Sequence, residues 1–384
     1  MARYNGGRLP THDQQLILQA TLTPGASPRQ AAIAWLSSVD LNQLDGASSL
    51  LLPLLHQRLA ADSPDLPLLP ILRGIRKRTW YRNRMLFPLA AQAIATLQQA
   101  AIPCLLLKGA ALTVSTYRDI SLRPMMDVDI LVPWAQGPAA LQLLLAAGWT
   151  LEDPRSTRPD YLTLARQFQH AVGLRHPSGQ GLDLHWNMLS FNLGPAIDDS
   201  IFPAARTIDF EGTPYPVPDP ADLLLHLCVH GFAWDRLAPI RWIPDSVLLL
   251  RAHPDLDWAR LLAAARARNI TTIVLATLDY LESLFPATVP PHVLTHLRAQ
   301  PAALFARLEY RQLLHPTDRL LGTMRRAPAK FLRSTAGLNP LRRALLVPTY
   351  LSWLWEVDRP TQLPAAFYRR LLRKLRSRTH RPAL

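Results

Sequence analysis

The hydrophobic pattern divides the chain into two helical stretches with a different segment between them. Apolar residues recur at three- and four-residue spacing in SSLLLPLLHQRLA and RMLFPLAAQAIATLQQA, both within residues 28–100. The same spacing returns over 221–234, 243–253 and 257–269 and continues to about residue 315. We predict helices in both stretches, with the basic cluster at 73–84 forming a solvated helix face.

Between residues 101 and 190 the apolar runs are shorter and alternate with helical segments. The pattern predicts a strand, a helix, a strand, a helix and a hairpin, in that order, at 102–107, 110–117, 125–133, 137–149, and 168–176 with 181–188. The hairpin is supported by the turn sequence PSGQ between its two strands. Strands that alternate with helices in this way indicate a small α/β or α+β unit.

The composition is that of a globular protein of a reducing compartment. The chain has 384 residues, of which 49% are hydrophobic, so it is long enough to bury a sizeable core. Its two cysteines, Cys104 and Cys228, lie in apolar runs and are expected to be buried thiols. We find no signal-peptide pattern at the N-terminus and no run of the ~18 apolar residues that a membrane span needs. These features predict a cytoplasmic protein without a transmembrane segment.

The net charge of +14 is concentrated at the C-terminal end. Residues 319–384 hold 15 Lys and Arg against two acids, whereas the other 318 residues hold 27 basic and 26 acidic side chains. Three interpretations of this segment stay open. It can be a basic extension packed on the body, a surface that contacts anionic membrane, or a surface that contacts nucleic acid or an anionic acceptor.

Two aspartates inside an apolar run are the strongest chemical signal in the sequence. Asp127 and Asp129 lie in MMDVDILVP, where alternation along a strand places both carboxylates on one face, ~6–7 Å apart. Asp183, on the strand GLDLHWNM, offers a third carboxylate. Carboxylates held this close repel one another unless a cation lies between them, and Mg²⁺ is the natural occupant. Three carboxylates on adjacent strands predict a site for two Mg²⁺ ions that act as catalytic metals.

A second group of residues is suited to bind phosphate. Lys108 and Gly109 stand at a strand-to-helix turn, where backbone N–H groups approach an anion closely, and Arg123 adds another cation. His185 follows Asp183 on the same strand face and is expected beside the carboxylates or against a base.

Three residues of the downstream helical stretch have less specific interpretations. His226 and His230 are spaced as zinc ligands can be, but no glutamate follows His226, so we interpret the pair as helix packing, with His230 near an acceptor. Asp245 is expected to cap a helix that begins at Ser246, or to orient Arg241 or His230.

These residues resemble the signature of a known family. The block LLLKGAALTVSTYRDISLRPMMDVDILVP, the strand GLDLHWNM and the helical block at 218–250 are similar to the uncharacterised nucleotidyltransferase family of the DNA polymerase β-like nucleotidyltransferase superfamily. The resemblance covers about residues 30–315. The usual glycine or serine after the first glycine of the turn is replaced here by Ala110, and Thr113 or Ser115 could supply the missing hydroxyl.

The resemblance implies a fold and a reaction. The fold is α+β, with a five-stranded minimal nucleotidyltransferase core, a small mixed sheet with helices, inside a mainly helical chain. The reaction moves a nucleoside monophosphate from an NTP to a hydroxyl, and the same resemblance makes Asp127, Asp129 and Asp183 the metal ligands and places Gly109 in the phosphate-binding turn. We expect a helical cap at 1–100, the catalytic core at 101–215, a helical domain at 216–318 and a basic extension at 319–384.

The acceptor is expected to be a small molecule or a protein hydroxyl. The alternative is a non-catalytic protein of this fold that binds RNA or anionic membrane through its basic end, at the periphery of the membrane.

Overall fold

The N-terminal region is helical, as its hydrophobic spacing predicts. The computed structural model describes residues 10–23, 28–62, 65–191, 193–233, 240–301, 304–314 and 319–369. The first helices are α1 (His12–Leu22), α2 (Pro28–Ser38), α3 (Gly46–Ser49), α4 (Leu52–Asp62) and α5 (Leu69–Gln99), with a 3₁₀ turn η1 (Leu41–Gln43). The basic cluster at 73–84 lies within α5, and most of its side chains are exposed, so the prediction of a solvated helix face is confirmed.

A five-stranded mixed sheet forms the centre of the chain, with strand order β1-β2-β5-β4-β3. The strands are β1 (Leu105–Leu107), β2 (Asp127–Leu131), β3 (Thr150–Leu151), β4 (Ala171–Arg175) and β5 (Gly181–His185). β2 runs parallel to β5 and antiparallel to β1, while β4 pairs antiparallel with both β5 and β3. The β4–β5 pairing confirms the predicted hairpin. The edge strand β3 was not predicted, because two residues carry no detectable periodicity.

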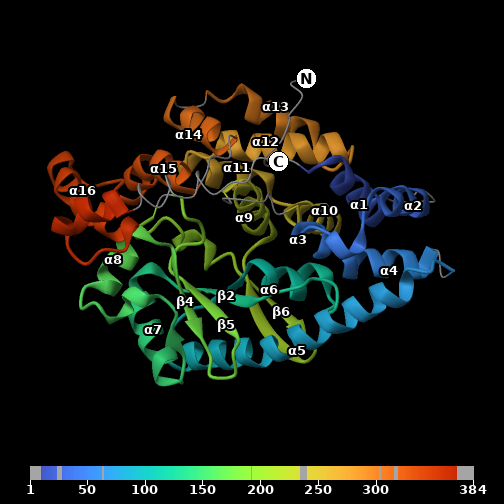
Figure 1. Ribbon diagram of the computed structural model, residues 1–384, viewed down its shortest axis with the longest axis horizontal. Coiled ribbons are helices and arrows are strands. Elements are labelled where there is room, and N and C mark those ends of the chain that lie inside the picture. The colour runs from blue at the N-terminus through green and yellow to red at the C-terminus, as the bar shows by residue number, and fades with distance from the viewer. Residues whose placement is uncertain are drawn as a thin grey trace.

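Short helices connect these strands and cover the sheet. They are α6 (Lys108–Leu112), the π-helical turn η2 (Thr113–Tyr117), η3 (Trp134–Gln136), α7 (Gly137–Ala146), η4 (Pro154–Thr157) and α8 (Tyr161–Phe168). The long α5 contacts β2 and α7, and α7 contacts β5, on one side of the sheet. Figure 1 shows α9 and α10 on the other side. The apolar residues of β2 and β5 are almost fully buried between these layers.

The second half of the chain adds a hairpin and a helical layer. The hairpin pairs β6 (Arg206–Phe210) with β7 (Thr213–Val217), and a 3₁₀ turn η5 (Asp199–Ile201) precedes it. The helices are α9 (Pro220–Ala233), α10 (Trp242–Ala252), α11 (Trp258–Ala267), α12 (Thr271–Leu284), α13 (Pro291–Ala299) and α14 (Leu304–Leu314). α9 contacts α6, α10, α11 and α12, so this layer is joined to the central unit through α9.

The described part of the C-terminal segment packs against the central unit. It consists of α15 (Arg319–Ser334), α16 (Pro340–Trp355) and the turn η6 (Pro360–Gln362), which lie beside α8 (Figure 1). Phe168 of α8 contacts Tyr350 and Trp353 of α16, with ring centroids 5.1 and 6.5 Å apart. The end of the predicted basic extension, from residue 370 onward, lies outside the described residues.

The α+β prediction, a small mixed sheet inside a mainly helical chain, is confirmed. None of the helices in the described ranges has the length and apolar character needed to cross a membrane.

Candidate functional site

The site forms where β2 and β5 run side by side. Parallel pairing places Asp129 directly opposite Asp183, and Leu131 opposite His185. One ligand atom from each of Asp129, Asp183 and His185 lies within 4.8 Å of the others. Carboxylate oxygens are the ligands that Mg²⁺ prefers, and an imidazole nitrogen is accepted by several other divalent metals. The donor set therefore fits a divalent cation.

Asp127 stands at the start of β2 and outside that compact group. Asp127 is exposed, whereas Asp129 is only 4% exposed. Partial burial raises the pKa of the Asp127 carboxyl to about 6, and the neighbouring carboxylates of Asp129 and Asp183 add to the rise. The two aspartates thus have different environments, with Asp129 enclosed and Asp127 at the mouth of the site.

Lys108 provides the positive charge nearest to these carboxylates. Its Nζ donates to Oδ1 of Asp129 and lies 3.5 Å from Nε2 of His185. The residue has a left-handed backbone with φ of 45°, which is unfavourable for a lysine, at the point where β1 turns into α6. Burial opposes the ammonium charge, but Asp129, Asp183 and Asp127 together raise the pKa of Lys108. The lysine is therefore held charged at the centre of the site.

His185 is fully buried and contacts Asp129. Its Nε2 lies 2.9 Å from Oδ1 of Asp129, and its Nδ1 lies 3.4 Å from the carbonyl oxygen of Asn187. In the tautomer with the ring proton on Nε2, His185 donates to this carboxylate. Burial alone would raise the pKa of Asp129, but Lys108 and His185 overcome this effect and hold it well below its usual range. His185 thus helps to keep Asp129 ionised and fixed.

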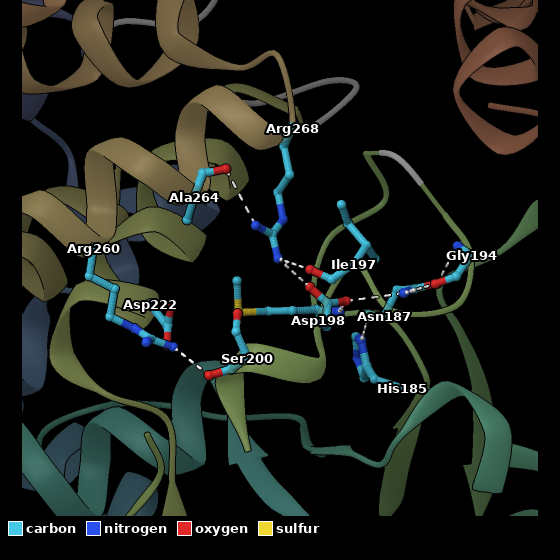
Figure 2. A network of polar contacts seen from close by, with 11 residues as sticks. His185, Asn187, Gly194, Ile197, Asp198, Ser200, Asp222, Arg260, Ala264 and Arg268 are labelled. Carbon is cyan, nitrogen blue, oxygen red and sulfur yellow. Dashed lines mark hydrogen bonds and ion pairs between the residues drawn. The ribbon is translucent and has the colours of Figure 1, made fainter. Parts of the chain in front are cut away.

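A network of hydrogen bonds and an ion pair stabilises the loop that follows β5 (Figure 2). Asn187 donates from Nδ2 to the carbonyl of Gly194 at 3.0 Å and to Asp198 at 3.1 Å. Arg268, just beyond α11, donates to Oδ1 of Asp198 at 2.5 Å and to the carbonyl of Ile197 at 2.8 Å. The network ties the end of β5, and with it His185, to the helical layer.

A buried ion pair lies beneath the turn at Gly109. Arg123 donates from Nε and Nη2 to the two oxygens of Asp245 at 2.9 and 2.8 Å, and the Tyr117 hydroxyl donates to the same carboxylate at 2.7 Å. Arg123 is only 4% exposed and Asp245 only 1%. A Cβ at Gly109 would lie 2.2 Å from Nη1 of Arg123. The turn therefore requires glycine, because the arginine is locked in place below it.

The structure corrects two expectations about neighbouring residues. Asp245 lies inside α10, which begins at Trp242, so it does not cap a helix that starts at Ser246. The hydroxyls of Thr113 and Ser115 donate to the carbonyls of Gly109 and Ala111 at 2.8 and 2.7 Å, and are therefore occupied within their own helix.

Helices α9 and α10 bring further charged and polar groups to this region. His226 and His230 contact each other on α9, with ring centroids 5.5 Å apart, which agrees with the interpretation as helix packing. Burial first, and then Lys108 among the neighbouring charges, lowers the pKa of His230 to about 3. Arg241, which precedes α10, donates to the carbonyl of Pro124 at 2.7 Å. This contact of Arg241 was not predicted, because nothing in its local sequence shows that it approaches the start of β2.

A pocket of about 730 Å³ opens beside Asp183. One wall is formed by β4 and α8, and the other by Lys330 of α15 with Glu356 and Asp358 after α16. Gly173 of β4 makes room for carboxylates, since a Cβ there would lie 3.0 Å from Glu152 and 3.4 Å from Asp183. The C-terminal segment thus contributes to the surroundings of the site.

Comparison with known proteins identifies the family. The model of the family described as "Uncharacterised nucleotidyltransferase" matches residues 46–286, so the chain belongs to this family, and the resemblance found in the sequence is confirmed. No curated protein matches the chain.

Two solved structures show distant similarity. One is a crystal structure of an antigenic nucleotidyltransferase-like protein from Paracoccidioides brasiliensis, with 15% identity, a TM-score of 0.33, and coverage of 60% of this chain and 94% of that one. The other is a solution structure of the antibiotic-resistance factor ANT(2'')-Ia, with 12% identity, a TM-score of 0.29, and coverage of 59% and 97%. Family membership and the site geometry are the observations that bear on function.

Proposed function

We propose that this protein transfers a nucleoside monophosphate from an NTP to a hydroxyl of a small-molecule or protein acceptor, with Mg²⁺ as the cofactor. The observation that carries the proposal is the register of β2 and β5, which sets Asp129 opposite Asp183 beside Lys108. Family membership supports the reaction class. In the reaction the acceptor oxygen forms a bond to the α-phosphorus, the bond from that phosphorus to the β-phosphate oxygen breaks, and pyrophosphate leaves.

The proposed roles follow from where each side chain lies. Asp127, Asp129 and Asp183 would hold two Mg²⁺ ions, with His185 fixing Asp129 through its hydrogen bond. Bound Mg²⁺ would supply Lewis-acid polarisation of the phosphate oxygens and activation of the attacking hydroxyl. Lys108 and the turn at Gly109 would bind the triphosphate. Arg123 as a direct phosphate ligand stays a prediction, but its buried pair with Asp245 supports a positioning role.

The acceptor would bind in the pocket beside Asp183. That carboxylate lines the pocket and would accept the proton that the acceptor hydroxyl loses. The second wall comes from the C-terminal segment, through Lys330, Glu356 and Asp358. In this proposal the C-terminal segment helps to select the acceptor.

The test is calorimetric titration of each NTP in Mg²⁺ buffer. Wild type is expected to bind at least one NTP in a Mg²⁺-dependent manner, and the Asp127→Ala/Asp129→Ala variant is expected to lose that binding. The control variant is Asp65→Ala/Asp279→Ala, which removes the same charge from two exposed ion pairs and should bind like wild type. Folded wild-type protein that binds no NTP would contradict the proposal.

A further inference from the structure

The polyphosphate of an NTP needs cations that it can reach and that are not held in a bidentate pair with a buried carboxylate. Arg123 does not meet this condition, since both of its pairing nitrogens are bound to Asp245 and it is almost fully buried. In addition, the carbonyl oxygens of Ile120 and Arg123 accept hydrogen bonds from the buried Asn83 of α5, at 2.6 and 2.8 Å. The loop that carries Arg123 is therefore anchored at both its side chain and its backbone.

Arg241 is in a different situation. Its Nη1 donates to the neutral carbonyl of Pro124 at 2.7 Å, and within the described ranges no carboxylate forms an ion pair with it. Burial first, and then the like charge of Arg123, lowers the pKa of Arg241 to about 10, which still leaves the guanidinium charged at neutral pH. A partly buried guanidinium that forms no ion pair with a described carboxylate is electrostatically suited to bind an anion.

The position of Arg241 places this charge at the mouth of the site. Pro124 lies just before β2, which begins at Asp127. The contact with the carbonyl of Pro124 therefore holds the guanidinium close to the start of β2, and Lys108 contacts Asp129 of the same strand. A phosphate group that shares a bound cation with Asp127 would therefore lie close to both Lys108 and Arg241.

We propose that Arg241, together with Lys108, binds the polyphosphate of the nucleotide. This inference rests on the proposed function and assigns the phosphate contact to an arginine that precedes α10. The cluster of Arg123, Tyr117 and Asp245 then acts as a positioning unit. Asp245 lies in the first turn of α10, so its bonds to Arg123 and Tyr117 fix the helix that Arg241 precedes.

The experiment compares full-length wild type with Arg241→Gln, Arg241→Lys and Arg84→Gln by calorimetry in Mg²⁺ buffer. The probes are the NTP that wild type binds best, its nucleoside, and inorganic tripolyphosphate. Arg241→Gln is expected to weaken binding of the NTP and of tripolyphosphate by about tenfold to a hundredfold, because a hydrogen bond to a charged group is lost. Binding of the nucleoside is expected to change by less than about twofold.

The two other variants separate charge, geometry and folding. Arg84→Gln removes an equal charge from an exposed pair with Glu211 and should bind all three probes like wild type. Arg241→Lys keeps the positive charge but loses the planar guanidinium, so its loss of affinity for NTP and tripolyphosphate should be intermediate. If Arg241→Gln does not fold, the affinities of Arg241→Lys test the inference.

Three results overturn the inference. The first is that folded Arg241→Gln binds NTP and tripolyphosphate as tightly as wild type. The second is that Arg241→Lys binds both probes as tightly as wild type when only that variant folds. The third is that a variant loses equal affinity for the nucleoside and for the triphosphate. If wild type itself binds no NTP, the proposed function fails first, and that outcome is distinct from all three.

Discussion

At the scale of single residues, the site depends on a few positions that hold charges in place. Lys108 adopts a left-handed backbone and pairs with Asp129, and His185 donates to the same carboxylate from the neighbouring strand. Gly109 follows Lys108 in the chain and lies against the side chain of the buried Arg123. A small change at Gly109 would therefore affect both this group of charges and Arg123.

Gly109→Ala is expected to destabilise the fold by about 1–3 kcal/mol. The new Cβ would lie 2.2 Å from Nη1 of Arg123 and 2.9 Å from Sδ of Met125, and Arg123 is held in place by Asp245. Gly74→Ala on the exposed side of α5 is the matched control, since nothing lies within 4 Å of the new Cβ. The control should stabilise the protein by up to about 1 kcal/mol through helix propensity. Urea denaturation measures both, and equal effects would contradict the proposed close approach.

At the scale of elements, α9 connects the central unit to the helical layer and buries two histidines. His226 is 4% exposed and packs against His230 one turn later. Burial lowers the pKa of both, to about 3 for His230 and well below the usual value for His226. Both imidazoles are therefore neutral in the folded protein at neutral pH.

The free energy of unfolding is expected to fall as the pH drops below about 6.5. In that range the unfolded chain protonates these histidines and the folded protein does not, so acid favours unfolding. Below pH 6.5 each histidine lowers the free energy of unfolding by about 1.4 kcal/mol per pH unit. For His230 this decrease continues until the pH approaches the folded-state pKa of about 3.

Urea titrations at pH 7, 6 and 5 measure this slope. His226→Gln and His230→Gln should each reduce it, whereas His12→Gln, at an exposed position at the start of α1, should leave it unchanged. An unaltered slope in the α9 variants would show that these histidines do not cause the acid sensitivity.

At the scale of the whole molecule, the basic C-terminal segment is partly built into the body. Arg155 stacks on the ring of Trp353 at 3.9 Å and donates to its carbonyl at 2.8 Å, and Arg158 donates to the carbonyl of Val357 at 3.1 Å. Arg333 of α15 forms a buried pair with Glu309. Deleting 319–384 would therefore remove a wall of the pocket as well as positive charge. Contacts of this segment with RNA or membrane stay predictions.

Trp353→Ala is expected to cost about 3–5 kcal/mol of stability, because the ring is 4% exposed and packs on Phe168. Trp355→Ala is the matched control. Its ring stacks on Phe367, which is 45% exposed, so a clearly smaller loss is expected. Thermal or urea denaturation measures both losses. Similar small losses in the two variants would indicate that α16 is not integral to the fold.

Local sequence was enough to find the carboxylates and most elements of the central unit. A two-residue alternation on a strand places Asp127 and Asp129 on one side, and the turn PSGQ pairs β4 with β5. The helices of both flanking regions follow from three- and four-residue spacing. Strand alternation, turn sequences and helical spacing depend on residues only a few positions apart, so they can be recognised directly in the sequence.

The partners of the charged residues were decided by tertiary structure. Arg123 was expected to bind phosphate, yet folding brings Asp245, 122 residues away, against it, while Arg241 reaches the carbonyl of Pro124 across 117 residues. An ion pair needs no periodicity or spacing, so nothing local distinguishes a cation that will be neutralised from one that will stay available. By itself the sequence determined which strands carry the carboxylates. Only the packing of α10 and of the C-terminal segment on the central unit decided which cations lie near them and which residues line the neighbouring pocket.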